Sequence, residues 1–335
     1  MNKLCIMFLV TATVSAVQPL HAETIKPFEY FSVYSLGDIG STASRSQADF
    51  DGAAGAGGDV WLTSSSIMSG SSDSYAMHAG GDFSVQWSGI VDGHVDAGGS
   101  IGMNGVTVTG NLYAGGDIYD YGWGNAMIGG SANAGGNVAL SSRATVQASH
   151  SGVAYEPQVN HQAVSEDFRQ TSEQVGNMAA MGSISNQYGK LVFVGSSGVN
   201  VVEVDQQTLR SAWGFTIIAP ADAVVLINVL DTSVTLDSTT WEFQGGIEKE
   251  AVLLNMANAV TLALSQTNGV NILAPLASTQ FQQGTVDGFL VVGNLYGGGQ
   301  VSGGAFTGAI PEPVTSSLLA AAAMLLLRRR RTINS

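Results

Sequence analysis

Three alternating polar residues are candidates for metal binding in this sequence. Asp92, His94 and Asp96 lie in the segment DGHVDAGG, where every second side chain is an acid or an imidazole. If this segment is one strand, all three point to one face, and two carboxylates with an imidazole can hold a divalent cation. The alternative is an outward polar face on a strand whose Val91 and Val95 point inward, which fits the alternation well.

A second set of carboxylates recurs after paired glycines. Asp59, Asp82 and Asp117 each follow Ala-Gly-Gly and would form a column if the repeats stack in register. Such a column can bind calcium, but the Gly-Gly-x-Gly-x-Asp repeat of calcium-loaded β-rolls is not found. Asp and Asn side chains commonly bond the backbone of a turn, and Asn137 occupies the same position. The pattern therefore favours a turn role, with calcium binding as the alternative.

Two further patterns match catalytic arrangements. GGSIG places Ser100 in a Gly-x-Ser-x-Gly pattern, which requires a strand, a turn and then a helix. The strand-like MNGVTVTG follows instead. Glu203 with Asp205, and Glu248 with Glu250, are carboxylate pairs of the kind that glycosidases use, although any acidic strand supplies them. We therefore expect a non-enzymatic protein, with a polysaccharide-active hydrolase or lyase as the alternative.

Aromatic residues gather in one segment, NLYAGGDIYDYGWG. Exposed rings here could stack on sugars, whereas buried rings would serve packing. The candidates for glycan contact are Tyr113, Tyr119, Tyr121 and Trp123. Within residues 23–309, Thr-x-Thr, which an ice-binding face would repeat, occurs once, at Thr107–Thr109.

The composition indicates a chain of many short strands. Of 335 residues 43 are glycine, only 11% are charged, and the formal net charge is −14. Four of the twelve basic residues lie together near the C-terminus, so the rest of the chain lacks the basic patches that nucleic-acid binding needs. The single cysteine, Cys5, leaves no cysteine for a disulfide in the body.

An irregular internal repeat predicts the fold. Ala-Gly-Gly, a polar residue and then an apolar residue recur at spacings near twenty, as AGGDV, AGGDF, AGGSI, AGGDI and AGGNV. This spacing predicts a mainly β, irregular β-solenoid in which each coil stacks on the previous one. Paired glycines are expected to permit a positive φ at each corner. The apolar residues expected in the core are Val60, Phe83, Ile101, Ile118 and Val138. An antiparallel sandwich is the alternative.

One segment, residues 161–181, has little glycine and predicts a helix. Val164, Phe168, Val175 and Met178 follow helical spacing, so we expect one amphipathic helix packed along the solenoid. Strands resume at KLVFVG and NVVEVD and continue to DGFLVVGNLYGGG.

The first 22 residues predict a secretory signal peptide. Lys3 precedes the apolar run 4–17, and Ala22 ends a plausible cleavage site. An uncleaved N-terminal anchor is the alternative. Cys5 lies at the start of the apolar run and not after it, which argues against a lipoprotein.

The C-terminal segment 310–335 predicts a sorting tail. The uncharged run 314–327 is expected to form a hydrophobic helix of about 21 Å, short of a bilayer core of about 30 Å. The basic cluster after it predicts a cytoplasmic end. The residues that carry the pattern are Pro311, Glu312, Pro313, Arg328, Arg329, Arg330 and Arg331. This layout resembles the PEP-CTERM sorting signal of Gram-negative bacteria. The resemblance implies processing by an exosortase, a transient inner-membrane anchor and a host that makes exopolysaccharide.

The body, residues 23–309, resembles the choice-of-anchor A family. FSVYSLGDIG, the repeated AGGD, the helix and NGVNILAPLASTQFQQGTVDGFLVVGNLYGGGQ carry the resemblance from about residue 28 to 306. It implies no catalytic residues, and some relatives are described as adhesins. The order of strands, helix and strands is also similar to bacterial ice-binding β-solenoids. We therefore expect a surface or matrix protein, structural or adhesive, that associates with exopolysaccharide or surface proteins. No cofactor is expected, except calcium as the alternative above.

Overall fold

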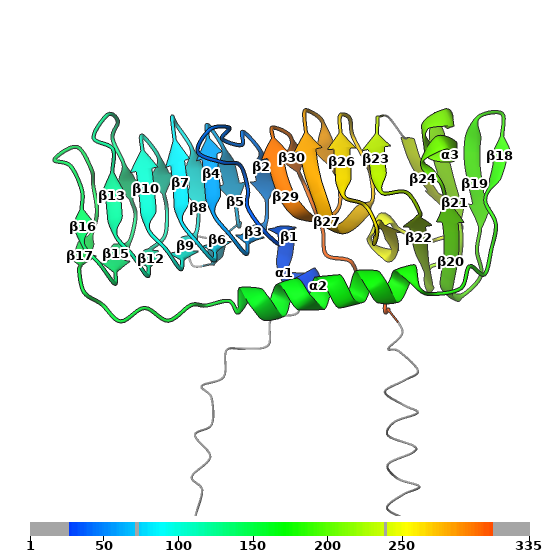
Figure 1. Cartoon of the computed structure of the whole chain (residues 1–335), viewed down its shortest axis with the longest axis horizontal. Helices are drawn as coiled ribbons and strands as arrows, with labels where there is room; N and C mark the ends of the chain where they lie inside the picture. Colours follow the sequence, from blue (N-terminus) through cyan, green and yellow to red (C-terminus); the bar gives the residue numbers. More distant parts are fainter. Residues whose placement is uncertain (1–26, 71–73, 238–239, 311–335) are drawn as a thin grey trace, which may run out of the picture.

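The molecule is a three-sided β-solenoid with a long helix along one side (Figure 1). The computed structural model describes residues 27–70, 74–237 and 240–310. The predicted signal peptide with Ala22, and the predicted sorting residues from Pro311 to Arg331, lie outside the described residues. Among the described residues no helix is long and apolar enough to cross a membrane.

We name the three sides faces A, B and C. Face A is the widest sheet, with neighbours in the order β17 (Ala148–His150), β15 (Ser131–Ala134), β12 (Leu112–Ala114), β9 (His94–Ala97), β6 (Tyr75–Ala79), β3 (Ala53–Ala56), β1 (Phe31–Ser35), β29 (Leu290–Gly297), β27 (Asn271–Phe281), β25 (Val252–Asn255), β22 (Ala223–Val229) and β20 (Gly198–Val204).

Faces B and C complete each coil. Face B contains β16 (Val138–Ala139), β13 (Ile118–Asp120), β10 (Ile101–Asn104), β7 (Phe83–Gln86) and β4 (Val60–Thr63), and further along β26 (Thr261–Leu264) and β23 (Ser233–Leu236). Face C contains β14 (Met127–Ile128), β11 (Thr107–Val108), β8 (Ile90–Asp92), β5 (Ser66–Met68), β2 (Asp49–Asp51), β30 (Gln300–Val301) and β28 (Thr285–Val286). A fourth sheet contains β18 (Ser185–Gln187), β19 (Lys190–Val194), β21 (Gly214–Ile218) and β24 (Thr240–Gln244).

The pairing is parallel, which contradicts the antiparallel sandwich. Among the described strand pairs only β18 and β19 run antiparallel. The apolar residue after each predicted corner is buried at Val60, Phe83, Ile101 and Ile118, and Val138 is partly buried at the last coil. Parallel coils stacked about 4.8 Å apart thus bury one another's inward side chains, as the repeat predicted.

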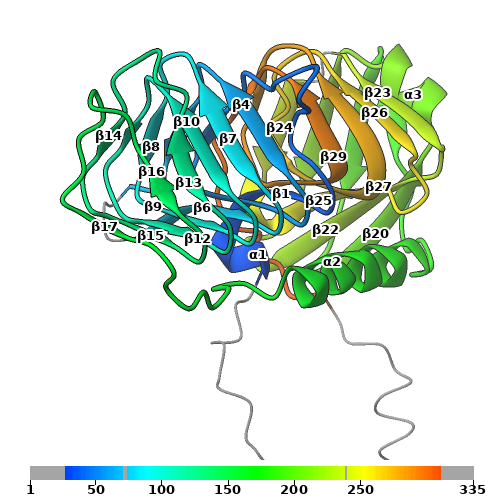
Figure 2. The same cartoon turned by 60° about the vertical axis from the view of Figure 1, so that its left-hand side comes forward.

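The chain winds from the middle of the molecule in two directions. It begins at β1, winds outward to β17, crosses back along α2 (His161–Gly176), and then winds inward from β20 to β29 (Figure 2). Strand β29 pairs in parallel with β1, with Val33 opposite Leu290. The two halves therefore share one continuous sheet, although their contacting strands lie far apart in sequence.

The corner between faces A and B is stabilised by a ladder of side chains. Asp59 Oδ1 accepts a hydrogen bond from the Asp82 amide at 2.8 Å, and Asp82 Oδ1 accepts one from the Ser100 amide at 2.7 Å. Ser100 and Asp117 continue the ladder to the amides of Asp117 and Asn137. Asp38 joins the ladder to Asn294 of the other half. The predicted turn role of the repeated polar residue is confirmed.

The reason for the paired glycines differs from the prediction. None of the glycines of the Ala-Gly-Gly repeats has a positive φ, so that expectation was wrong. A Cβ at Gly80 would lie 2.2 Å from the Gly57 carbonyl oxygen, and one at Gly81 would lie 2.1 Å from Asp59 Oδ1. Glycine is needed because successive corners approach too closely for a side chain.

Helix α2 covers face A, as expected, but ends at Gly176 instead of 181. Asn160 caps it by accepting from the Ala163 amide, and Asn177 ends it. Val164, Phe168 and Val175 are buried, and Met178 is partly buried beyond the helix. This stripe forms a second apolar core, separate from the interior of the solenoid.

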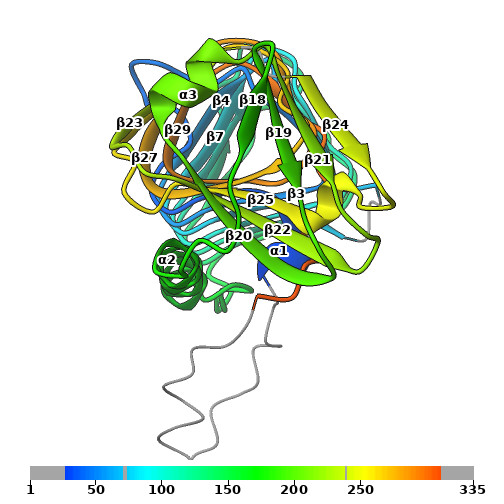
Figure 3. The same cartoon turned by 90° about the vertical axis from the view of Figure 1, so that its right-hand side faces the viewer.

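Both ends of the described chain lie on the α2 side. Short helix α1 (Pro27–Tyr30) places Phe28 against Phe168, Phe289 and Phe306, with ring centroids 4.9 to 6.3 Å apart. Viewed along the solenoid, face A lies below, and the corner between faces B and C is the opposite apex (Figure 3). Two further short elements are α3 (Gln206–Ser211), at the apex of the far end, and η1 (Lys249–Ala251).

Candidate functional site

The outward surface of face B carries a patch of aromatic and polar side chains. Trp61, Ser84, Gly102 and Tyr119 occupy the same register position in four successive coils. The two rings are thus separated by two small residues and by about 14 Å of sheet. Tyr119 lies over Gly102, since a Cβ there would be 2.9 Å from the tyrosine Cζ atom.

Polar groups connect the two rings. The Arg45 guanidinium lies 5.2 Å from the centroid of the Trp61 ring and donates to the hydroxyl of Ser84 at 3.1 Å. The same hydroxyl is 3.1 Å from the Tyr121 hydroxyl. Tyr121 in turn packs edge-on against Tyr119, with centroids 5.3 Å apart. Contacts of a cation with ring faces and of hydroxyls with one another hold these half-buried rings in place.

The two tyrosines differ in acidity. Burial raises the pKa of Tyr119 to about 12, and its hydrogen bond with Tyr121 acts in the same direction. Burial also acts to raise the pKa of Tyr121, but hydrogen bonds with Ser84, Tyr119 and Gln86 and the charge of Arg45 lower it below its ordinary value. Both hydroxyls can form hydrogen bonds with a ligand.

Two tryptophans extend the patch to the corner between faces B and C. Trp87 and Trp123 are 58% and 76% exposed, which is far more than packing side chains allow. They lie two coils apart, because the Trp87 amide bonds Asn104 in the coil between them and Gly124 packs on Gly105 of that coil. Trp87 has a φ of 61°, an uncommon conformation for a bulky residue. We name Arg45, Trp61, Ser84, Trp87, Tyr119, Tyr121 and Trp123 together the aromatic patch.

Only part of the predicted aromatic cluster lies in this patch. Tyr119, Tyr121 and Trp123 lie there, but Tyr113 points outward from face A, where it packs against Tyr75 and His94. Sequence reasoning missed Arg45, Trp61, Ser84 and Trp87. Trp61 follows the AGGDV repeat, so its register with Tyr119 after AGGDI was the available signal. Nothing local indicated Arg45.

The metal site predicted at Asp92, His94 and Asp96 requires that these residues lie on one strand, but they are divided between β8 and β9. Gly93, with a φ of 140°, turns the chain between β8 and β9, so the three side chains do not share one face. Asp92 Oδ1 accepts from Thr109, and His94 Nδ1 accepts from the Asn111 amide at 2.9 Å. Among the described residues no group of three His, Cys, Asp or Glu side chains is arranged to hold a metal ion.

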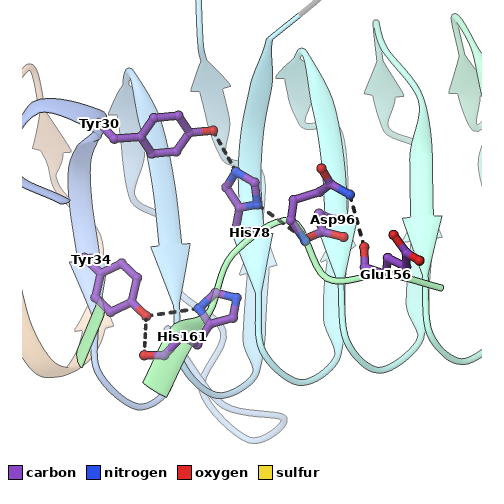
Figure 4. A network of polar contacts seen from close by, with 7 residues as sticks. Tyr30, Tyr34, His78, Asp96, Glu156 and His161 are labelled. Atoms are coloured by element: carbon purple, nitrogen blue, oxygen red, sulfur yellow. Dashed lines mark hydrogen bonds and ion pairs between the residues drawn. The ribbon is translucent and has the colours of Figure 1, made fainter. Parts of the chain in front are cut away.

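Asp96 belongs to a buried network beneath the segment that leads into α2 (Figure 4). His78 lies between the Tyr30 hydroxyl, 2.8 Å from Nε2, and Asp96 Oδ2, 3.4 Å from Nδ1. Both His78 and Asp96 are fully buried. The carboxylate also accepts from the Gln158 amide at 3.2 Å. This network fixes the crossing segment to face A.

His161 lies in the first turn of α2, with its imidazole partly buried. Its Nδ1 lies 3.0 Å from the Tyr34 hydroxyl. Burial, followed by the charge of His78, lowers the pKa of His161 to about 4, while Asp96 acts in the opposite direction. A cavity of about 410 Å³ adjoins this ring and the corner glycines Gly57, Gly80 and Gly98.

The residues predicted as possible catalytic groups, Ser100 and the two carboxylate pairs, do not lie in catalytic arrangements. Ser100 occupies the corner ladder, with strand β10 after it and no helix. Glu203 lies in β20, whereas Asp205, after the strand, caps α3 by accepting from the Thr208 amide at 2.6 Å. Glu248 precedes η1, in which Glu250 lies. None of these is a facing pair on one strand.

Comparison with models of protein families shows which family this chain belongs to. The model of a family described as "Putative Ice-binding-like adhesive domain" matches residues 25–303, and the chain belongs to this family. The match covers nearly all of the solenoid. No curated protein and no solved structure gives a significant match.

Proposed function

We propose that this protein is an exported surface adhesin that binds exopolysaccharide through the aromatic patch. The observation that carries the proposal is the alignment of Trp61 and Tyr119 in one register column, with Trp87 and Trp123 exposed beside it. Membership in the adhesive-domain family supports an adhesive role. The stacked coils place these rings along one direction, as an extended polymer requires.

The chemistry of the patch fits a sugar chain. The C–H face of a pyranose is flat and apolar and packs on an aromatic ring, while its hydroxyls need hydrogen-bonding partners. Arg45 and Tyr121 supply those partners beside the rings. Between Trp61 and Tyr119, the Arg45 guanidinium covers Ser84 and the Tyr119 ring covers Gly102, so the outer surface of face B is continuous. An extended polymer can therefore lie along the face in contact with both rings.

The position of the chain ends supports display of this patch. Phe28 and Phe306 lie together on the α2 side, opposite the corner that carries Trp87 and Trp123 (Figure 3). If the signal peptide exports the chain and an exosortase acts at Pro311, Glu312 and Pro313, attachment occurs on the α2 side. The aromatic patch then faces away from the cell.

The test is co-sedimentation of the full-length protein with the host's own exopolysaccharide. We expect Tyr119→Ala with Trp123→Ala to weaken binding at least about tenfold, since exposed aromatic anchors dominate recognition surfaces. Tyr113→Ala, on face A, is the matched control and should bind as the unchanged protein does. Equal binding by the double variant would contradict the proposal. Shortening of the polymer in the same tube would instead support the polysaccharide-active enzyme.

A further inference from the structure

The far end of the solenoid exposes a second aromatic pair. Tyr188 is 102% exposed and Trp213 is 57% exposed. Tyr188 lies in the turn between β18 and β19 with a φ of 55°, next to Gly189 with a φ of 83°. Trp213 lies between α3 and β21. Neither ring fills the core, so packing does not explain their presence.

Trp213 is fixed in place despite its exposure. The Trp213 indole Nε1 donates to the Tyr188 carbonyl oxygen at 3.2 Å. The Trp213 backbone amide donates to the Gly189 carbonyl oxygen at 3.0 Å. Lys190 Nζ lies 5.2 Å from the centre of the ring and 2.7 Å from Glu242 Oε2. A hydrogen bond from Lys190, opposed by slight desolvation, lowers the pKa of Glu242. An ordered, exposed ring loses little conformational entropy when it binds a ligand.

The second pair lies on the same edge of the molecule as the first. Trp213 follows α3, on the side of face B, and precedes the fourth sheet (Figure 3). It is therefore at the apex opposite face A, as are Trp87 and Trp123. Face A has six strand steps between β3, whose coil carries Trp61 of the aromatic patch, and β20, which correspond to about 29 Å. The two sites are too far apart to form one continuous contact.

We infer that Tyr188, Trp213, Lys190 and Glu242 form a second polysaccharide-binding site, so that one molecule bridges two polymer chains. The inference rests on the proposed function, since the ligand is the same class of hydroxyl-rich polymer. The indole face would take the apolar side of a sugar ring. Lys190 and Glu242 beside it offer a donor and an acceptor for hydroxyls. A rigid solenoid keeps the sites apart, which favours bridging between chains over binding twice to one short segment.

The test measures cross-linking separately from binding. Full-length protein is mixed with the host's exopolysaccharide, and the stiffness of the gel and the co-sedimented protein are recorded together. For Trp213→Ala we expect at least about a tenfold higher protein concentration for the same stiffness, because one of two linked sites is lost. Binding through the aromatic patch should persist. Val194→Ala, an exposed apolar change at the same end, is the matched control, and Trp213→Phe should retain most of the cross-linking.

The outcomes separate the two proposals. Binding that persists while Trp213→Ala loses cross-linking supports the second site. Cross-linking by Trp213→Ala at the concentration that the unchanged protein needs would overturn it and leave the proposed function standing. Absence of any binding by the unchanged protein would overturn both. A patch variant with Tyr119→Ala and Trp123→Ala provides an independent check, because its residual binding should disappear when Trp213→Ala is added.

Discussion

Removal of one step of the corner ladder should weaken the solenoid by a predictable amount. Asp82 Oδ1 accepts the Ser100 amide at 2.7 Å, and its own amide is bound by Asp59. Asp82→Ala keeps the hydrogen bond from the residue 82 amide to Asp59 Oδ1 but removes the acceptor of the Ser100 amide. A hydrogen bond to a charged acceptor contributes about 1.5 to 3 kcal/mol. The corner is partly open to water, so we expect a loss of about 2 kcal/mol. For a domain of this size the midpoint of thermal unfolding should fall by roughly 3 °C.

The measurement is thermal and urea unfolding followed by circular dichroism, with hydrogen exchange of the corner amides. Asp82→Asn keeps an acceptor oxygen and should lose less than half as much stability. Asp222→Ala, at an exposed carboxylate before β22, is the control and should change little. Exchange at the Ser100 amide should accelerate before that of amides in β20. If Asp82→Ala unfolds at the same temperature as the unchanged protein, the ladder does not stabilise the corner and our reasoning is wrong.

Three further changes test other parts of the structure. Phe168→Ala should cost about 3 to 5 kcal/mol and should expose the amides of α2 to hydrogen exchange before those of face A, because the ring anchors the helix. Below pH 6.5 the unfolded chain protonates His161 while the folded chain does so only near its pKa of about 4. The free energy of unfolding should therefore fall by about 3 kcal/mol as the pH is lowered from 6.5 to about 4. In the His161→Gln variant, the midpoint of urea unfolding should depend less on pH over this range. Calcium or a chelator should leave the unfolding midpoint unchanged, since Asp59 and Asp82 already accept backbone amides; a shift would revive the calcium alternative.

Much of the fold could be predicted because it is encoded locally. The spacing of the Ala-Gly-Gly repeats gives the length of one coil, and the apolar residue after each repeat, such as Phe83, is buried. The helical spacing of Val164, Phe168 and Val175 gives the packed face of α2. Each of these features depends only on residues within one coil or one helix, so a single sequence contains the information.

The junction of the two halves depends on contacts between distant segments. Strand β1 pairs with β29, and the Asp38 amide donates to Asn294 Oδ1 at 2.9 Å. GNLYAGGDI and GNLYGGGQV are similar in sequence. That similarity does not predict that the second copy, in β29, pairs with β1. The aromatic patch has the same difficulty. Arg45 reaches Ser84 across two coils, and no spacing within its own loop predicts the partner.

The polar corner residues explain why this sequence contains patterns that resemble catalytic or metal-binding motifs. A parallel coil presents an amide at each corner, and a polar side chain in the neighbouring coil is the nearest acceptor. Ser100 accepts at one corner and His94 at another, so a nucleophile pattern and a ligand pattern arise from the same structural need. The exposed rings of Trp87 and Trp123 at the apex satisfy no such need, since they do not fill the core. In a solenoid of this kind, exposed rings in register are therefore better indicators of a binding surface than polar motifs at the corners.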